Sequence, residues 1–269
     1  MSKSQYHRTR YKYIYKHMIL DELTIFRQHG KQFIPDITKP VLPGPFKGRP
    51  EITLEKVDEE ALAALCPTGA ISKAPVSIDL GKCVMCGECA FAFPSKIKFT
   101  KDYKIATNVR ENLIVKEGDL DPIVLDESKI RKEIQTLFGR SLKLREISAA
   151  GANADEAELN ACGNVNFDMG RFGIEFLASP RHCDGIVITG PISENMAEAV
   201  QICYDAIPDP KLVILVGSDA ISGGIHAGSN ALERTFLEKY SVDLYVPGNP
   251  PHPLTFVNGI LELIRKKEK

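Results

Sequence analysis

The 269-residue sequence predicts two folded parts, a small α+β domain followed by a doubly wound α/β domain. The first prediction comes from four cysteines gathered between residues 66 and 89. The second comes from short runs of Val, Ile and Leu that alternate with helical patterns from residue 127 onward. A connector precedes both parts, because residues 35–50 contain five prolines and two glycines and cannot be helical.

Residues 1–47 are predicted to form a basic arm and this proline-rich connector. Lysines and arginines alternate with tyrosines in the first 20 residues, and no acidic residue precedes Asp21. Such an arm suits anionic lipid or a partner protein. A frayed or packed terminal extension is the alternative interpretation.

The α/β prediction covers residues 127–269. Helical patterns span 127–139, 195–207 and 254–267, and strand patterns span 142–147, 174–179, 184–190, 211–217 and 242–248. Strands rich in Val, Ile and Leu between helices indicate a parallel sheet covered on both faces, and we expect a flavodoxin-like fold. Its functional edge would be built by the loops at 149–156, 179–184, 189–196, 217–224 and 247–253, none of which carries a phosphate-binding glycine motif.

The overall composition excludes several classes of protein. At 43% apolar and 26% charged residues with a net charge of −1, the chain is an ordinary globular protein with no general demand for nucleic acid. No apolar run is long enough to span a membrane, and the N-terminus has no apolar core typical of a secretory signal, so we expect a cytosolic protein. In a reducing compartment, clustered cysteines favour metal binding over disulfides.

Cys83, Cys86 and Cys89 are spaced C-x2-C-x2-C, as in ferredoxins, but Phe93 stands before Pro94 where the fourth cysteine is expected. Cys66, followed by a proline, is typical of the end of an earlier motif of the same kind. The first three ligand positions of that earlier motif are occupied by Lys56, Glu59 and Leu62.

In two-cluster ferredoxins, three cysteines of one motif bind the same cluster as the fourth cysteine of the other. Positions 56, 59, 62 and 93 would then form one site, and all four lack a thiol. The other site is complete. We therefore predict one 4Fe-4S cluster bound by Cys66, Cys83, Cys86 and Cys89, with Leu62 and Phe93 filling the space of the absent one. Zinc bound by the same four thiolates is the alternative.

The stretches "FKGRPEI", "CPTGAI", "CVMCGEC" and "FTKDYKIAT" resemble the ferredoxin-like subunits of respiratory complex I and of energy-converting nickel-iron hydrogenases. The second half resembles the small subunit of the same complexes, through "LFGRSLKLREI", "RFGIEFLASPRHCDGIVITGPISENM", "YDAIPDPKLVILVGSDAISGG" and "VDLYVPGNPPHP". The resemblance implies a fusion of a ferredoxin-like domain, residues 48–115, with a small-subunit-like domain, residues 127–269.

The resemblance also implies a difference from the family. Family members hold a further 4Fe-4S cluster through four cysteines of the small subunit, and the matching positions here are Ala152, Asp155, Asp219 and Asn249. These side chains cannot bind such a cluster, so we expect it to be absent. The oxygen donors among them could bind a hard cation, be solvated as exposed loop acids, or hydrogen-bond with one another.

Other residues near these loops have two interpretations each. Glu156 matches a glutamate that transfers protons in the hydrogenases, and a carboxylate at a helix start explains it equally well. Arg181 and His182 match a loop that faces the large subunit, and a structural role for His182 is the alternative. Cys162, Cys183 and Cys203 are expected to be buried small hydrophobic residues.

We therefore predict an iron-sulfur subunit of a membrane-associated complex related to complex I and energy-converting hydrogenases, which transfers electrons through one 4Fe-4S cluster. The alternative is an assembly or coupling subunit whose cluster is structural or redox-sensing. The expected partners are a large-subunit homologue and membrane-arm subunits, at the inner face of the cell membrane. No nickel ligands are encoded, and a flavin enzyme is disfavoured because no phosphate-binding loop is present.

Overall fold

The computed structural model describes residues 20–25, 27 and 33–265. The chain divides into two units, residues 1–35 and 36–269, which are described separately. In the first unit, residues 20–25 and 27 are helical. The predicted basic arm, residues 1–19, and the last residues of the predicted C-terminal helix, 266–269, lie outside the described residues. The described part of the connector contains turns and bends but no helix, as predicted.

A five-stranded parallel sheet organises the second half of the chain. The strands are β6 (Leu142–Ser148), β7 (Ile174–Phe176), β8 (Gly185–Thr189), β9 (Leu212–Val216) and β10 (Leu244–Val246). Their spatial order is β10-β9-β8-β6-β7, which is the flavodoxin-like order 2-1-3-4-5 when the strands are numbered along the chain. The predicted fold class is confirmed. The topological switch point lies between β6 and β8.

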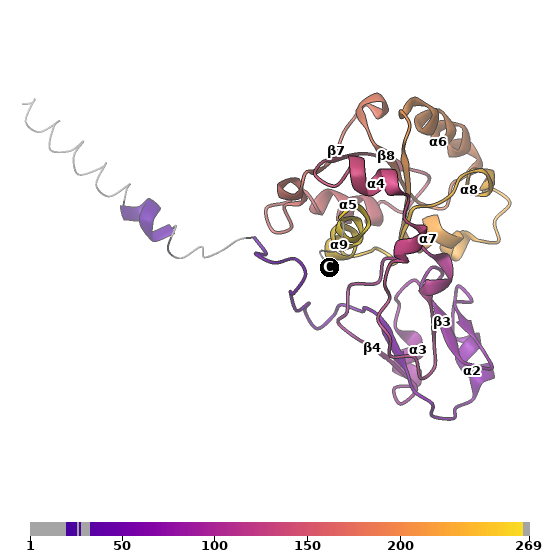
Figure 1. Ribbon diagram of the computed structural model, residues 1–269. Helices are drawn as coiled ribbons and strands as arrows, with labels where there is room; N and C mark the ends of the chain where they lie inside the picture. Colours follow the sequence, from indigo (N-terminus) through magenta and orange to yellow (C-terminus); the bar gives the residue numbers. More distant parts are fainter. Residues whose placement is uncertain (1–19, 26, 28–32, 266–269) are drawn as a thin grey trace, which may run out of the picture. The chain divides into compact units, whose positions relative to one another are not determined.

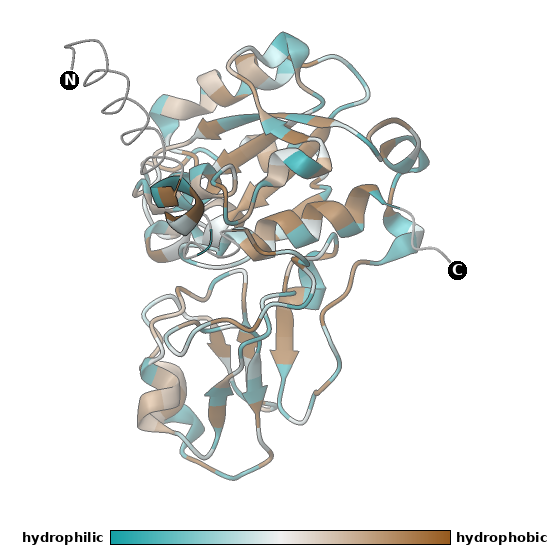
Figure 2. Cartoon of the chain, turned by 90° about the vertical axis from the view of Figure 1, so that its left-hand side faces the viewer, coloured by the Kyte–Doolittle hydropathy of each residue, from teal (hydrophilic) through white to brown (hydrophobic). Residues whose placement is uncertain are grey.

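Helices cover the two faces of this sheet (Figure 1). Every residue of β8 and β9 is buried, which explains their uninterrupted Val, Ile and Leu sequence. On one side α4 (Lys132–Leu137) and α5 (Ala154–Ala161) contact α9 (Pro253–Ile264), and elsewhere α6 (Glu194–Ala206) contacts α8 (Thr235–Lys239). Helix α9 is buried along nearly all of its length, and Figure 2 shows it as largely hydrophobic.

Several of the loops predicted at the functional edge are partly helical, above all 217–224 and 149–156. Residues 217–224 contain α7 (Gly217–Ser222), which ends at the left-handed Gly223 (φ 91°), and they run into η5 (Gly224–His226). Helix α5 begins at Ala154, so Asp155 and Glu156 are helical. A helix of six residues is too short to show a hydrophobic period, which explains why the sequence pattern indicated a loop. Shorter turns of helix are η2 (Glu127–Lys129), η3 (Met169–Phe172) and η4 (Pro180–His182).

Residues 50–116 form two small antiparallel sheets. One pairs β1 (Pro50–Ile52) with β4 (Ile97–Phe99), and the other has the order β2 (Ile71–Ser72), β3 (Ser77–Asp79), β5 (Ile114–Lys116). Helix α2 (Glu59–Ala64) lies between β1 and β2 in the chain, and α3 (Glu88–Ala92) lies between β3 and β4. The opening strand of each β-α-β half therefore pairs with the closing strand of the other half. The two halves are folded around each other.

This cysteine-bearing part contacts the large sheet directly. Thr107, which follows β4, forms an antiparallel bridge to Tyr245 of β10, with N···O distances of 3.1 and 2.8 Å. The bridge occupies hydrogen-bonding groups of the edge strand β10 that would otherwise be open to another chain. A 3₁₀ turn, η1 (Arg110–Leu113), then leads into β5.

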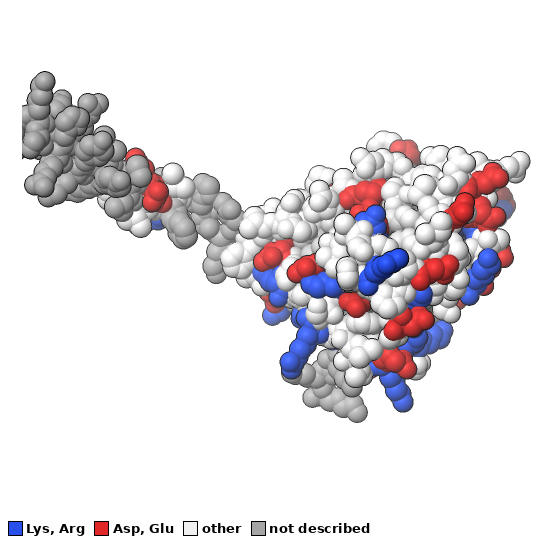
Figure 3. Space-filling model, turned by 90° about the horizontal axis from the view of Figure 1, so that it is seen from above, with Lys and Arg blue, Asp and Glu red and all other residues white. Residues whose placement is uncertain are grey.

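The surface carries charges of both signs. Figure 3 shows Lys and Arg interspersed with Asp and Glu over one face, in keeping with the net charge of −1. Among the described residues, every helix is too short or too polar to span a lipid bilayer.

Candidate functional site

The four cysteines of the predicted cluster site line one pocket. Cys66 follows α2, whereas Cys83, Cys86 and Cys89 lie in the loop after β3 and in the first turn of α3. The pairing of β2 with β3 brings these two segments together. The remaining walls of the pocket are mostly apolar and include Leu65, Ala70, Ile71, Ile78, Val84 and Phe99.

The shape of the cysteine loop depends on two residues with left-handed backbones, Met85 (φ 53°) and Gly87 (φ 87°). They flank Cys86 and curl the loop around the pocket. The Met85 backbone N–H donates to Cys83 Sγ at 3.4 Å. On the other segment the Ala70 N–H donates to Cys66 Sγ at 3.2 Å. Hydrogen bonds of this kind to cluster sulfurs tune the potential of an iron-sulfur centre.

The thiols of this pocket differ in exposure. Cys83 and Cys89 are buried, Cys66 is half-buried and Cys86 is exposed. Burial raises the pKa of Cys83 to about 12 and that of Cys89 to about 11, and the neighbouring thiols act in the same direction. These two thiols are therefore protonated at neutral pH until a metal displaces the protons.

The donor set fits an iron-sulfur cluster in its chemistry, because four soft sulfur ligands share an apolar pocket with two N–H···S hydrogen bonds. Within residues 20–25, 27 and 33–265, no three His, Cys, Asp or Glu side chains converge closely enough to hold a single metal ion. The four thiols thus line one pocket, but no three of them are close enough to bind one metal ion.

The counterpart positions in the other half are not ligands. Leu62 is completely buried, and Phe93 is partly buried against the same apolar core. Lys56 is exposed, and Glu59 begins α2, where its carboxylate accepts a hydrogen bond from the Ala74 N–H at 3.1 Å.

At the switch point of the large sheet, Glu156 joins the carboxyl ends of two strands. Its Oε1 accepts hydrogen bonds from Ser148, the last residue of β6, at 2.6 Å and from Thr189, the last residue of β8, at 2.7 Å. Burial acts to raise the pKa of Glu156, but these two hydrogen bonds together with one from the backbone outweigh it, and the pKa is lowered. Nothing in the sequence indicates that Ser148 and Thr189 hold this carboxylate, because the contact depends on strand register.

Asp155 and Asp219 are buried, so the alternative of exposed, solvated loop acids does not hold for either of them. They are 6% and 7% exposed, at the start of α5 and in the first turn of α7. Burial, with the charges of Asp219 and Glu156, raises the pKa of Asp155 to about 7. The positive end of α5 favours the carboxylate by only about 0.3–1 kcal/mol. This is less than one pKa unit, so burial dominates.

Asn249 and Ala152 complete the four positions that the resemblance singled out. The Asn249 Nδ2 donates to Ser218 Oγ at 2.9 Å and to Asp219 Oδ1 at 3.3 Å, so two of the four side chains hydrogen-bond with each other. Ala152 is exposed in the turn before α5. Burial raises the pKa of Asp219, whereas His226 and the Asn249 hydrogen bond act to lower it.

Arg234 stabilises the backbone around Asp219, a role that the sequence does not predict. Its guanidinium donates to the backbone oxygens of Pro191, Asp219, Ala220 and Ile221 at 2.8–3.3 Å. It thereby fixes α7 against the loop after β8. Nothing in the local sequence distinguishes this arginine from a solvated one.

The remaining candidates lie apart from these two sites. Arg181 and His182 are exposed on η4. Cys162, Cys183 and Cys203 are all buried, which confirms the expectation for them.

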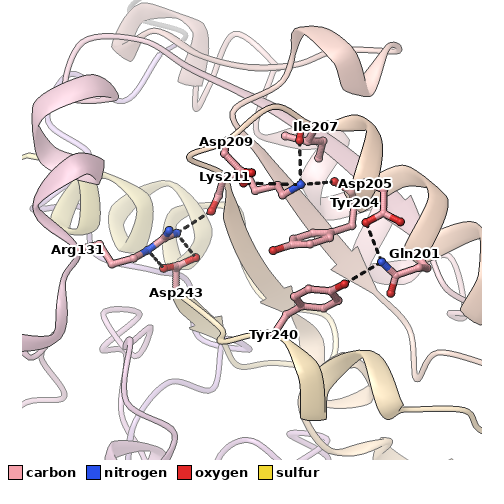
Figure 4. Close-up of polar contacts among 9 residues, drawn as sticks. All are labelled: Arg131, Gln201, Tyr204, Asp205, Ile207, Asp209, Lys211, Tyr240 and Asp243. Carbon is pink, nitrogen blue, oxygen red and sulfur yellow. Dashed lines mark hydrogen bonds and ion pairs between the residues drawn. The ribbon is translucent and has the colours of Figure 1, made fainter.

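A cavity of about 520 Å³ lies at the opposite, amino-terminal edge of the strands. Figure 4 shows how its polar groups are arranged: Arg131 makes two hydrogen bonds to Asp243, each 3.0 Å, and Lys211 donates to the carbonyls of Tyr204 and Ile207. The Lys211 ammonium also lies 4.2 Å from the centre of the Tyr204 ring. These contacts hold strand starts and the end of α6 in place, so we interpret this edge as structural.

Comparison with known proteins places the second half of the chain in a family. The family of the NADH ubiquinone oxidoreductase 20 kDa subunit matches residues 153–263. An NADH-quinone oxidoreductase protein of Heliobacterium modesticaldum is 37% identical over 153 residues, which cover 56% of this chain and 86% of that protein. The chain belongs to the NADH ubiquinone oxidoreductase 20 kDa subunit family.

Other relatives of the chain come from different complexes. A probable membrane-bound hydrogenase subunit of Pyrococcus furiosus is 30% identical over 147 residues, which cover 54% of this chain and 88% of that protein. A chain in the structure of the membrane-bound sulfane sulfur reductase, an archaeal respiratory membrane complex, is 34% identical, with a TM-score of 0.41. That match covers 47% of this chain and 70% of the other.

The 20 kDa family match includes Asp155, Asp219 and Asn249 and starts directly after Ala152. Cys66 and the cysteine loop lie outside it. The geometry of the cysteine pocket is therefore a property of this chain that the family match does not describe.

Proposed function

We propose that this chain is an electron-transfer subunit of a membrane-associated complex related to complex I and membrane-bound hydrogenases. It carries one 4Fe-4S cluster on Cys66, Cys83, Cys86 and Cys89 and lacks the cluster of its small-subunit-like domain. The observation that carries the proposal is that these four thiols line one apolar pocket. When bound, such a cluster accepts and releases one electron.

The pairing of the small sheets supports the assignment of ligands. Because β2 pairs with β3 and β1 with β4, each half of the cysteine-bearing part contributes to both small sheets. This interlocking brings Cys66 beside the cysteine loop of the other half. We propose on this basis that residues 48–115 are a ferredoxin-like domain fused to a small-subunit-like domain, residues 127–269.

The residues of the chain have separate tasks in this function. Ile71, Ile78 and Phe99 keep water from one side of the four thiols, and the N–H groups of Met85 and Ala70 stabilise negative charge on the sulfurs. Cys86, which is exposed, lies where an electron donor or acceptor can approach.

The cysteine loop is also close to the loop after β10. Met85 lines a pocket of about 180 Å³ together with Pro247, Gly248 and Pro250, the neighbours of Asn249. In this proposal Asn249 occupies a former ligand position, so no second cluster receives the electron inside this chain. The acceptor must belong to another subunit, and a large-subunit homologue covering the strand-end loops, with Arg181 and His182 facing it, is the proposed partner. We place the assembly at the cytoplasmic face of the membrane, through membrane-arm subunits.

An assembly or coupling subunit is the second candidate, and a specific observation favours it. Asn249, Ser218 and Asp219 form a hydrogen-bonded set where a ligand set is expected from the resemblance. A fold kept for its docking surface would show this pattern, and its cluster would be structural or redox-sensing.

Electron paramagnetic resonance of the anaerobically purified complex separates the two candidates. For electron transfer, one cluster signal appears on reduction by the donor at least as fast as turnover, and Cys86→Ala abolishes turnover in an assembled complex. For the assembly role, the signal of a structural cluster stays absent throughout the working potential range, that of a redox-sensing cluster appears more slowly than turnover, and in both cases an assembled Cys86→Ala complex turns over normally. The second result would reject electron transfer.

A further inference from the structure

The Asp155 side chain lies in a tight, largely buried place beside the end of β9. It is 6% exposed, and among the described residues it makes no hydrogen bond or ion pair. It lies against Gly217, where a Cβ atom would come within 2.3 Å of Oδ2. The glycine thus leaves room for the carboxyl group.

A second buried carboxyl group lies near it. Asp219, on the first turn of α7, is 7% exposed, and its charge acts on Asp155. A Cβ atom on Gly224 would collide with Asp219 Oδ1, so this carboxyl group also occupies space that a glycine provides. Its side-chain hydrogen-bond donor is the Asn249 amide.

Of the other charged groups around the pair, His226 favours the charge of Asp219, and none favours the charge of Asp155. Glu156, next to Asp155 on α5, adds negative charge and is held by Ser148 and Thr189. His226, on η5, acts to lower the pKa of Asp219. Arg234 donates to the backbone oxygen of Asp219 and to three other carbonyls.

A carboxylate buried without a cation or a donor is costly, and two neighbouring carboxylates in such a place cannot both ionise easily. The first of them to take up a proton gains a hydroxyl donor and removes the repulsion. The charged form of Asp155 is the less stabilised of the two, since Asp219 already accepts a hydrogen bond from Asn249.

We propose that Asp155 and Asp219 form a proton-binding site, in which Asp155 carries one proton at neutral pH and exchanges it in the physiological range. The site lies at the carboxyl end of the sheet, beside the switch point. The shift of the Asp155 pKa to about 7 supports this assignment. The site does not involve the cysteine pocket, so this proposal can fail without affecting the proposed electron transfer, and the reverse is also true.

The test is infrared spectroscopy of the full-length chain between pH 5 and 9, in variants matched by charge. We expect the C=O band of a protonated carboxylic acid that disappears as pH rises, with a midpoint near pH 7. Asp155→Asn removes this band. Glu198→Gln, which changes a carboxylate on α6 away from the pair, leaves it unchanged. Asp219→Asn keeps the band and moves its midpoint to lower pH, because the repelling charge is gone.

Three results would overturn the proposal. The first is a band that survives in Asp155→Asn, and the second is a midpoint that Asp219→Asn does not move. The third is stoichiometric binding of Mg²⁺ or Ca²⁺ that Asp155→Asn abolishes, since the pair would then be a cation site. If Asp155→Asn does not fold, ¹³C-carboxyl labelling of aspartate in the unmodified chain decides the matter. An aspartate resonance titrating near pH 7 supports the proposal, and its absence rejects it.

Discussion

The buried Lys96 forms an ion pair with the half-buried Glu117, with 2.5 Å between Nζ and Oε2. The Lys96 ammonium also donates to the Glu55 backbone oxygen at 2.8 Å. Its hydrogen bond to Glu117 is the largest cause of the lowered pKa of that carboxyl group. The pair joins the segment before β4 to the end of β5, away from the four thiols.

The two partners of this pair are predicted to differ in their contribution to stability. The Lys96 side chain is 2% exposed and that of Glu117 is 19% exposed. Glu117→Ala leaves the Lys96 ammonium buried without its carboxylate partner, whereas Lys96→Met leaves the Glu117 carboxylate, which water can reach. Urea unfolding should therefore show the larger loss of unfolding free energy for Glu117→Ala. An equal or larger loss for Lys96→Met would mean that the burial of the ammonium is not what makes the pair important.

Gly81 is predicted to be essential for the contact between the cysteine-bearing part and α7. A Cβ atom there would lie 2.8 Å from Ile221 Cγ2 and 2.7 Å from Arg110 Cζ. Arg110 is held by two hydrogen bonds to Asp79, so it cannot move away freely. Gly81→Ala should lower the unfolding free energy by about 1–3 kcal/mol through overpacking. Gly44→Ala, which has open space around the new methyl group, is the control and should be nearly neutral.

Replacing one cysteine of the pocket should remove the cluster without unfolding the chain. Cys86 is exposed, so Cys86→Ala deletes a ligand while changing little packing. We expect iron content and visible absorption to fall to background after anaerobic purification, with circular dichroism unchanged. Cys203→Ala changes a buried cysteine outside the pocket and should retain both iron and colour. Full iron content in Cys86→Ala would show that this thiol is not a ligand.

The buried Asp155 predicts a specific dependence of stability on pH. Its pKa is raised from 3.8 to about 7 in the folded chain, so between these values the folded state binds a proton that the unfolded state has lost. The stabilising contribution of this proton to the free energy of unfolding is fully present below pH 3.8, declines as pH rises from about 4 to 7, and is absent above that range. The loss is on the order of 4 kcal/mol. Asp155→Asn should flatten the stability curve in this window, as measured by urea unfolding at about pH 5 and pH 8, and an unchanged slope would contradict this.

Uninterrupted apolar runs, separated by helical patterns, were enough to predict the large sheet. The apolar runs of β8 and β9 and the amphipathic α6 appear in the structure within a few residues of their expected places. The approach of Cys66 to the cysteine loop also followed from a rule about motif order. The local sequence did not predict helix α7, because its six residues make fewer than two helical turns.

The remaining features depend on tertiary contacts between distant segments. Asp155 and Asp219 are acids in glycine-containing stretches, which is the usual composition of a solvated loop, and only strand order places them in a buried crevice. Arg234 and Lys96 have sequence neighbourhoods like those of surface residues. Their burial is decided by partners 13 or more residues away, such as Ile221 for Arg234.

Metal analysis of the anaerobically purified chain tests most directly whether the chain binds one iron-sulfur cluster and no second one. We expect about four iron atoms and four acid-labile sulfides per chain. About eight of each would show that a second cluster is present, and zinc without sulfide would show that the four thiols bind a different metal. Either result, or a chain free of metal, would contradict the proposed function.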